Sequence, residues 1–280
     1  MNKVYGLIGC PVGHSMSPLI HNDQLQHKKI SAAYHAFHVE KEHLKAAVEG
    51  ARALGIAGFN VTIPHKISII PFLDELDQSA ELLGAVNTVL NKEGRLIGYN
   101  TDGQGYLESL MQLMDKPLQE QRYLIIGAGG AARAIFYTLA SVGASAIDLA
   151  NRTPEKARML MEECPHKVEG NVFSLHEAES LLSDYDVIIQ TTAIGMHPNE
   201  TEKPFAASSI RKGTIVSDIV YNPVKTAFLT EAEKAGARIL NGVGMFVYQA
   251  ALSFEIWTGE KPDTARMSKL VFAQLGGNSC

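Results

Sequence analysis

The sequence YLIIGAGGAA, from Tyr123 to Ala132, joins a run of apolar residues to a glycine-rich turn. The apolar run predicts a buried strand, and the alanine-rich residues after the turn predict a helix. In the pattern Gly-x-Gly-x-x-Ala, Gly127 permits the tight turn, Gly129 lets the backbone approach a pyrophosphate, and Ala132 lets the helix lie close to the sheet. The alternative is a tight strand-to-helix turn that binds nothing. The residues expected to hold a dinucleotide are Gly127, Ala128, Gly129, Gly130 and Ala131.

The end of the following strand indicates which dinucleotide is bound. An enzyme that uses NAD usually presents Asp or Glu to the ribose 2′-hydroxyl there, about twenty residues after the glycine motif. Here the expected strand 146–150 ends in Asn151-Arg152-Thr153, with Lys156 one turn later. A guanidinium can pair with a 2′-phosphate through two hydrogen bonds, while a hydroxyl and an ammonium nearby add a donor and charge. The pattern favours NADP over NAD, the alternative for Arg152 being a solvated surface arginine.

Strands and helices alternate along the whole chain, which predicts an α/β protein. Downstream of the glycine motif the order is that of a doubly wound dinucleotide-binding (Rossmann-type) domain, with a parallel sheet between helices. Its expected strands are 123–126, 146–150, 187–191, 214–218 and 237–240, and its expected helices 131–142, 154–163 and 225–235. Two further helices, 244–258 and 263–275, follow without a strand between them, and we expect them to pack back on the neighbouring domain.

The first hundred residues predict a second α/β domain. Its expected strands are 4–9, 33–39, 56–61, 86–90 and 95–99, and its expected helices 18–27, 44–51 and 75–83. The last two strands, joined by a turn at 91–94, predict a hairpin, so we expect a mostly parallel sheet with one antiparallel edge. A helix over 102–114 leads into the polar, proline-broken segment 115–120, which is typical of a connection between domains.

Composition excludes several classes of function. The chain has 280 residues, 46% of them hydrophobic and 20% charged, and its 25 Lys and Arg against 30 Asp and Glu give a formal charge of −5. Without a basic excess, binding to nucleic acid or to an anionic membrane surface is not expected. The longest uncharged stretch, 4–22, is broken by two prolines, so neither a membrane span nor a secretory signal is expected. Cys10, Cys164 and Cys280 match no disulfide or zinc pattern, which favours the cytoplasm and no metal.

Polar residues stand at the ends of the expected strands in the first half. Ser17 before Pro18 is a normal helix N-cap, but Ser15 has no such explanation, and two hydroxyls beside a helix N-terminus can bind one carboxylate. Further polar residues at strand ends are Asn60, Thr62, Lys66, Asn87 and Asp102. A buried Asn or a helix-capping Asp would explain each of these alone. Together they predict a ligand site, because open α/β sheets bind ligands at the carboxyl ends of their strands.

These residues resemble the shikimate dehydrogenase family, whose members are NADP-dependent enzymes of the aromatic amino acid pathway. The resemblance covers essentially the whole chain. It rests on GHSMSP at 13–18, NVTIPHK at 60–66, GAVNT at 84–88, GYNTDG at 98–103, GAGGAAR at 127–133, NRT at 151–153, DIVYNP at 218–223 and GVGM at 242–245. It implies a substrate-binding domain at 1–102, joined by the C-terminal helices within 244–280, and an NADP-binding domain at 103–243.

The resemblance also implies an activity and roles for residues. The activity is the reversible reduction of 3-dehydroshikimate to shikimate by NADPH, with Lys66 and Asp102 as the catalytic pair. The implied substrate ligands are Ser15, Ser17, Asn60, Thr62, Asn87, Asp102, Tyr221 and Gln249, and Ile219, Gly242 and Met245 are expected near the nicotinamide. Two other interpretations stay open, a quinate/shikimate dehydrogenase that uses NAD and a catalytically idle NADP-binding regulator. The chain could act as a homodimer or as a monomer.

Overall fold

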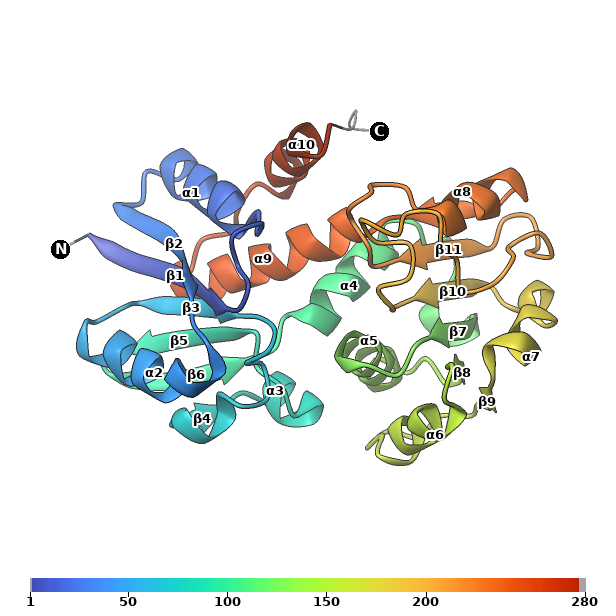
Figure 1. Cartoon of the computed structure of the whole chain (residues 1–280), viewed down its shortest axis with the longest axis horizontal. Coiled ribbons are helices and arrows are strands. Elements are labelled where there is room, and N and C mark those ends of the chain that lie inside the picture. Colours follow the sequence, from blue (N-terminus) through green and yellow to red (C-terminus); the bar gives the residue numbers. More distant parts are fainter. Residues whose placement is uncertain (1, 277–280) are drawn as a thin grey trace. The chain divides into compact units, whose positions relative to one another are not determined.

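The computed structural model describes residues 2–276 of the 280 and divides into two compact units (Figure 1). The N-terminal unit contains residues 2–101 together with Val247–Val271, and the central unit contains Asp102–Phe246 and residues 272–276. We had expected the first boundary one residue later, after 102, and the second earlier, before 244. Asp102 begins a helix, Asp102–Met111, that packs closely on the central unit, where a Cβ added to Gly103 would lie 2.0 Å from Oγ1 of Thr138.

The N-terminal unit is a six-stranded sheet with helices on both faces. Its elements are β1 (Lys3–Gly9), α1 (Ser17–His27), β2 (Ala32–His38), α2 (Leu44–Ala53), β3 (Gly58–Val61), β4 (Glu75–Leu76), α3 (Gln78–Leu83), β5 (Thr88–Lys92) and β6 (Arg95–Tyr99), with 3-10 turns at Lys41–His43 and Ile70–Phe72. The strand order is β2-β1-β3-β5-β6-β4. Apolar side chains from α2 cover one face, and those from α1 and the C-terminal helix α9 (Gly242–Thr258) cover the other.

The single antiparallel strand, β5, lies inside this sheet, whereas the sequence led us to expect it at an edge. It pairs antiparallel with β3 on one side and β6 on the other. The hairpin forms as expected, but its turn is shorter than 91–94, because Lys92 already pairs with Arg95. Glu93 and Gly94 make the turn with φ angles of 55° and 91°, the left-handed conformations that a two-residue hairpin requires.

The helix expected over 75–83 was wrong in its first turn. Glu75 and Leu76 form β4, which pairs with β6 and completes the sheet. Asp77 then ends the strand and begins α3, since its backbone N–H donates to Gly98 O at 2.8 Å and its carboxylate accepts from Ser79 N at 2.9 Å. An N-cap carboxylate satisfies a free amide of the first turn and so places the start of the helix after residue 77.

The C-terminal helices pack on the N-terminal unit, as expected. Trp257 on α9 donates from Nε1 to Val89 O at 2.9 Å and stacks on Tyr5 with the ring centroids 5.2 Å apart. Gly58 makes this approach possible, because a Cβ there would lie 2.4 Å from the indole. The last helix, α10 (Thr264–Gln274), is held by Arg266, whose guanidinium donates to both carboxylate oxygens of Asp23.

His21 lies in this aromatic core. Its ring stacks on Tyr34 with centroids 4.5 Å apart, and neither ring nitrogen has a hydrogen-bond partner among the described residues. Burial lowers the pKa of His21 from its ordinary value of 6.5 to about 3. The folded protein therefore keeps this histidine neutral, whereas the unfolded chain takes up a proton as the pH falls below 6.5.

We expect His21→Phe to make the protein less sensitive to acid. As the pH falls from 6.5 to 4.5, His21 takes up a proton in the unfolded chain but stays neutral in the folded protein. The free energy of unfolding of the wild type should therefore fall by about 2–3 kcal/mol more than that of the variant. Urea denaturation at a series of pH values measures this difference. His35→Phe offers a control, since it makes the same replacement at an exposed position. Equal acid sensitivity of wild type and His21→Phe would contradict a neutral buried ring.

The central unit is the expected doubly wound domain. Its elements are α4 (Asp102–Met111), β7 (Arg122–Ile126), α5 (Gly130–Ser141), β8 (Ala146–Ala150), α6 (Pro154–Glu162), β9 (Val172–Phe173), α7 (Leu175–Glu179), β10 (Val187–Gln190), β11 (Ile215–Asp218), α8 (Ala227–Lys234) and β12 (Arg238–Leu240), with 3-10 turns at Leu118–Glu120 and Leu182–Asp184. All strands of the sheet β12-β11-β10-β7-β8-β9 are parallel. The elements β9 and α7 were not expected, because two and five residues are too few for a periodic pattern.

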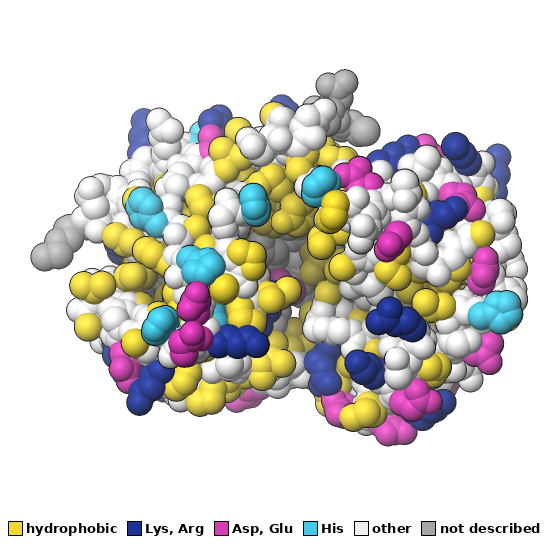
Figure 2. All heavy atoms as spheres, in the orientation of Figure 1, with side chains coloured by type: hydrophobic (Ala, Val, Ile, Leu, Met, Phe, Trp, Pro, Cys, Tyr) yellow, Lys and Arg dark blue, Asp and Glu magenta, His cyan; other side chains and the backbone are white. Residues whose placement is uncertain are grey.

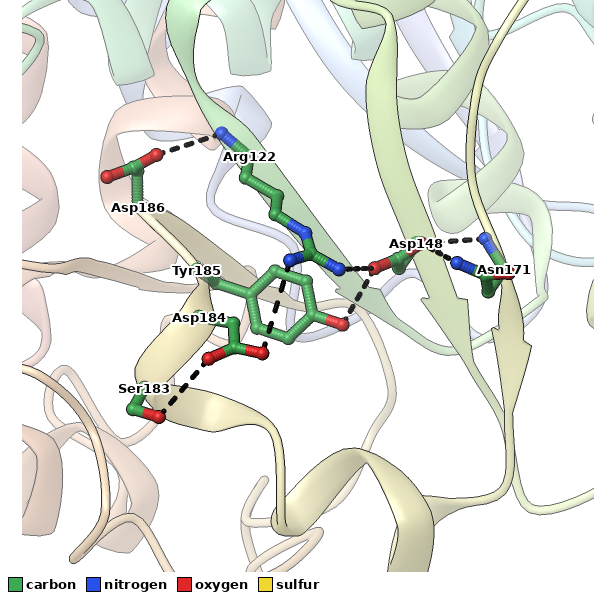
Figure 3. A network of polar contacts seen from close by, with 7 residues as sticks. All are labelled: Arg122, Asp148, Asn171, Ser183, Asp184, Tyr185 and Asp186. Carbon is green, nitrogen blue, oxygen red and sulfur yellow. Dashed lines mark hydrogen bonds and ion pairs between the residues drawn. The ribbon is translucent and has the colours of Figure 1, made fainter.

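A buried carboxylate ties the strands of this unit together (Figure 3). Asp148 on β8 accepts hydrogen bonds from Tyr185 Oη at 2.8 Å, Asn171 N at 2.6 Å and Arg122 Nη2 at 3.2 Å. The Arg122 guanidinium also lies 5.2 Å from the centre of the Tyr185 ring, within the range of a cation–π contact. Asp148 is therefore a structural carboxylate that joins β7, β8, the residue before β9 and the residues before β10.

Cationic and anionic side chains are interspersed over the face shown in Figure 2. No helix within residues 2–276 is long and apolar enough to cross a membrane. In the same range no group of three or more His, Cys, Asp or Glu side chains is placed to hold a metal ion, and Cys10 and Cys164 are free thiols. Cys280 lies outside the described residues.

Candidate functional site

A cavity of about 270 Å³ opens in the central unit at the carboxyl ends of β7, β8 and β10. This is where open α/β sheets bind their ligands, because the loops after neighbouring parallel strands converge there. The cavity is lined by Gly127, Ala128, Gly129, Asn151, Arg152, Thr153, Lys156, Thr191 and Thr192. Gly130 and Ala131, which we also expected at the dinucleotide, form the first turn of α5 beside this lining.

The glycine turn has the geometry that its pattern predicts. Gly127 has a φ of 116°, a conformation that L side chains rarely adopt, and a Cβ there would lie 2.4 Å from Oγ1 of Thr191. Gly129 precedes α5 as its N-cap residue, and no side chain makes a capping hydrogen bond at this helix start. The first amides of α5 therefore face the cavity side with their donors available to an anion such as a pyrophosphate.

Two cations lie beyond β8, Arg152 in the turn at its tip and Lys156 on α6. Asn151 N donates to Phe173 O at 3.1 Å, and Asn151 Nδ2 donates to Thr153 O at 2.8 Å, so the tip is held against the neighbouring strand in a closed turn. Arg152 and Lys156 are both exposed and both line the cavity. No carboxylate lines the cavity within residues 2–276. Guanidinium, ammonium and hydroxyl groups together fit a 2′-phosphate, and the absence of an acidic ribose ligand disfavours NAD.

Thr191 and Thr192 belong to the cavity but were missed in the sequence. Thr191 Oγ1 donates to Ile126 O at 2.6 Å, and its backbone N–H donates to the same oxygen at 2.9 Å. Thr192 Oγ1 accepts from Ile194 N at 3.2 Å. The only signal in the sequence was their place at the end of an apolar strand, next to the strand that carries the glycine motif.

We expect Arg152→Ala to weaken NADP⁺ binding about tenfold to a hundredfold while leaving NAD⁺ binding nearly unchanged, because only the 2′-phosphate differs between them. Isothermal titration calorimetry with each dinucleotide measures both affinities. Arg158 on α6, the helix that follows Arg152, is a matched control, since it is exposed, lies near Glu155 and does not line the cavity. Equal losses for both dinucleotides would show that Arg152 has a structural role.

The segment after β11 meets the start of α9 within the central unit. Gly242 N donates to Val220 O at 3.1 Å, and a Cβ on Gly242 would lie 2.1 Å from Ile219 O. Tyr221 lies with its ring centroid 5.4 Å from that of Phe246, and burial raises the pKa of its phenol. The structure therefore brings Ile219, Tyr221 and Gly242 together, with Met245 half-buried one turn into the helix.

The expected substrate ligands of the N-terminal unit share one edge of its sheet. Ser15 follows β1, Thr62 and Lys66 follow β3, and Thr101 and Asp102 follow β6. Asn87, which we expected within a strand, instead stands directly before β5, and because β5 runs antiparallel its beginning lies at this same edge. The Lys66 carbonyl accepts from Val86 N at 2.7 Å, which places the turn of Lys66 beside Asn87.

Several of these side chains are joined in a buried polar network. Asn60 Oδ1 accepts from Tyr34 Oη at 2.7 Å, and Asn60 Nδ2 lies 3.1 Å from each of Asn87 O, Thr88 Oγ1 and Ser253 Oγ. Both the oxygen and the nitrogen of the Asn60 amide are thus hydrogen-bonded to protein groups, as expected for a side chain that holds neighbouring residues in place. Asn87 Oδ1 accepts from Thr101 N at 2.9 Å. The network places Asn87 and Thr101 at the sheet edge from within the core.

Helix α9 closes this network from the other side. Ser253 Oγ lies 2.7 Å from Thr88 Oγ1, and Thr101 Oγ1 donates to Gln249 O at 3.0 Å. Gln249, an expected substrate ligand, is therefore held by its backbone next to Asn87. Tyr34 and Ser253 were missed in the sequence, whereas Thr88 and Thr101 lie within the motifs GAVNT and GYNTDG but were given no role of their own. No local pattern marks Ser253, which lies 193 positions from its partner Asn60.

The sequence predicted Ser17 as the N-cap residue of α1, and this was wrong. The N-cap residue is Met16, the helix begins at Ser17, and no side chain makes a capping hydrogen bond there. Ser15 Oγ donates to Ser17 Oγ and accepts from Ser17 N, both at 3.2 Å. The two hydroxyls therefore lie side by side at the helix start, in an arrangement that can bind one carboxylate.

We expect Ser253→Ala to lower the free energy of unfolding by about 1–3 kcal/mol, because it leaves the buried Asn60 and Thr88 short of a hydrogen-bond partner. Urea denaturation measures the change. A matched control is Ser268→Ala, which removes a hydroxyl on α10 that bonds only to the backbone carbonyl of Thr264. Equal effects of the two substitutions would contradict a cooperative role for Ser253.

The doubly wound sheet, the glycine turn at an uncapped helix and the cationic strand tip define a dinucleotide-binding protein, here with a second α/β unit that carries a polar sheet edge. Comparison with known proteins places it more closely. The chain belongs to the shikimate dehydrogenase family. Its residues 7–89 match the shikimate dehydrogenase substrate binding domain, residues 109–220 match the shikimate / quinate 5-dehydrogenase model, and residues 242–272 match the shikimate 5′-dehydrogenase C-terminal domain.

Individual relatives are similar over their full length. A shikimate dehydrogenase (NADP(+)) from Bacillus cereus (strain AH187) is 54% identical over 277 residues, covering 99% of this chain and 100% of that protein. A crystal structure of a shikimate dehydrogenase in complex with NADP⁺ is 43% identical, with a TM-score of 0.90 over 98% of this chain and 96% of the other. The shikimate 5-dehydrogenase of Thermus thermophilus, solved with NADP(H) and shikimate, is 33% identical, with a TM-score of 0.87 over 97% and 99%.

Proposed function

We propose that this protein catalyses the reversible reduction of 3-dehydroshikimate to shikimate by NADPH, a step of chorismate and aromatic amino acid biosynthesis. The observation that carries the proposal is the 54% identity, over essentially both whole chains, with a relative named for this substrate and cofactor. The cavity at Arg152 and Lys156 supports it, since its lining suits the 2′-phosphate that distinguishes NADP from NAD.

We propose the following roles, which the resemblance to the family implies. Bound NADPH supplies the hydride to the carbonyl carbon. Negative charge then develops on the former carbonyl oxygen, where the ammonium of Lys66 stabilises it and Lys66 or Asp102 delivers the proton. In the reverse direction the same group accepts the proton from the hydroxyl. Ser15 and Ser17 bind the substrate carboxylate with the help of Tyr221, while Thr62, Asn87 and Gln249 orient the ring hydroxyls.

Asn60 keeps a place in this proposal, with a changed role. Its amide is hydrogen-bonded on both sides to protein groups, so we assign it to holding Asn87 and Thr88 in place for the substrate.

The protein is further proposed to act in the cytoplasm without nucleic acid or membrane partners. Light scattering after size-exclusion chromatography distinguishes the homodimer from the monomer.

Lys66→Ala should lower kcat for shikimate oxidation by about a thousandfold and leave the affinity for NADP⁺ within about twofold, because it removes the charge that meets the developing alkoxide. Steady-state absorbance of the nicotinamide gives kcat, and calorimetry gives the affinity. Lys45→Ala, an exposed lysine of α2 near Glu49, is the control. Unchanged turnover in Lys66→Ala would remove lysine from the mechanism.

The competing function is oxidation of quinate with NAD. It is considered because the family model that matches residues 109–220 is described as shikimate / quinate 5-dehydrogenase. Absorbance assays that pair shikimate and quinate in turn with NADP⁺ and NAD⁺ separate the two. Turnover confined mainly to shikimate with NADP⁺ is expected. Comparable rates with quinate and NAD⁺ would support the broader enzyme, and cofactor binding without any turnover would support a regulator.

A further inference from the structure

Two polar side chains lie fully buried at the ends of the central strands, outside the residues assigned so far. Gln190 is the last residue of β10 and Asp218 the last of β11, and the two are opposite one another in the parallel register. Both side chains are buried, with exposed fractions of 0%. Burying a carboxylate is unfavourable unless it is hydrogen-bonded, so its partners indicate what it does there.

Asp218 holds the segment that follows its own strand. Its Oδ1 accepts from Val220 N at 3.0 Å, and its Oδ2 accepts from Thr226 Oγ1 at 2.8 Å. Burial raises the pKa of Asp218 to about 6, and these hydrogen bonds act in the opposite direction. The Val220 bond bends the chain back over the strand end, so that residues 219–221 leave the sheet in one defined direction.

Gln190 holds the turn after the neighbouring strand. Its Nε2 donates to Thr192 O at 3.2 Å and to Ile194 O at 3.1 Å, and its Oε1 accepts from Thr192 N. The same Nε2 lies 3.5 Å from Oδ1 of Asp218, the outer limit of a hydrogen bond. Since Thr192 lines the dinucleotide cavity, the amide of Gln190 connects the cavity wall to Asp218.

The other end of the arrangement reaches Gly242. Val220 donates to Asp218 through its N–H and accepts from Gly242 N through its carbonyl, at 3.1 Å. There is no room for a side chain on Gly242 against Ile219 O. A second link, from His197 N to Asn222 O at 3.0 Å, joins the two loops further out. The position of residues 219–221 therefore follows that of the Asp218 carboxylate.

We propose that Asp218 and Gln190 are positioning residues for the reaction, which act as one unit to hold the cavity wall at Thr192 and the segment 219–221 in the arrangement that hydride transfer requires. The inference rests on the proposed function, because Ile219 and Gly242 are expected near the nicotinamide only if the protein catalyses that reaction. The alternative is a purely structural role, in which Asp218 serves α8 through Thr226, the N-cap residue of that helix.

Asp218→Ala and Asp218→Asn separate these roles. An asparagine keeps an oxygen for Val220 N, and its amide can donate to the Thr226 hydroxyl, so both contacts survive, whereas alanine removes both. We expect Asp218→Ala to lower kcat for shikimate oxidation about tenfold or more and Asp218→Asn to restore it to within about threefold of wild type. The affinity for adenosine 2′,5′-bisphosphate, which probes only the Arg152 end, should stay within about twofold in both, as calorimetry measures.

Gln190→Ala tests whether the two residues act together. It should lower kcat about fivefold or more, and the double variant Asp218→Ala/Gln190→Ala should be no slower than Asp218→Ala alone, since residues of one unit are not additive. Asp148→Asn provides the matched control, because it replaces another buried carboxylate of the same sheet by an amide at a position that does not line the cavity. It should lower the melting temperature without changing kcat.

The outcomes distinguish this inference from the function on which it rests. If the wild type oxidises shikimate, three results would overturn the positioning role alone. They are an unchanged kcat in Asp218→Ala, additive losses of kcat in the double variant, and a loss of bisphosphate affinity that parallels the loss of kcat. Failure of the wild type to oxidise shikimate would overturn the proposed function, and this inference with it.

Discussion

Parallel pairing of strands is the constraint on which both candidate regions depend. Neighbouring strands of a parallel ladder end at the same edge, so the direction of the strands alone brings the loops that follow them together. In the central unit this brings residues 127–129, 151–153 and 191–192 around one cavity. In the N-terminal unit it gathers Ser15, Thr62 and Lys66, and the antiparallel course of β5 adds Asn87 from the beginning of a strand.

Both units hold these loops from within the core. In each, a buried amide or carboxylate at a strand end, Asn60 in one and Asp218 in the other, is hydrogen-bonded to the segment that carries the proposed ligands. A buried polar group left without partners destabilises a fold by about 1–3 kcal/mol, so the loops can shift only if the core gives up such bonds. Hydrogen bonds of buried side chains thus fix the positions of the surface loops.

The sequence predicted what is local and missed what is distant. Gly127 and Arg152 could be found because a strand, a turn and a helix within thirty residues impose their residue types. The helical and strand periodicity likewise located nearly every long element. Ser253 could not be found, since its role arises only when α9 meets Asn60 across 193 positions. The interior place of β5 was missed for the same reason, because strand order is decided by contacts between segments, and β9 was too short to leave a pattern.

Helix α9 has a consequence for the order in which the protein is made. The N-terminal unit needs Trp257, which stacks on Tyr5 and bonds to Val89, yet residues 102–246 of the central unit lie between them in the chain. A ribosome therefore delivers β1 to β6 long before the helix that covers them. The central unit is complete as soon as Phe246 and the residues before it have emerged, apart from the few residues after Phe272. The strands that are synthesised first are thus covered only after nearly all of the central unit has been made, and their aromatic face stays exposed until Trp257 has emerged.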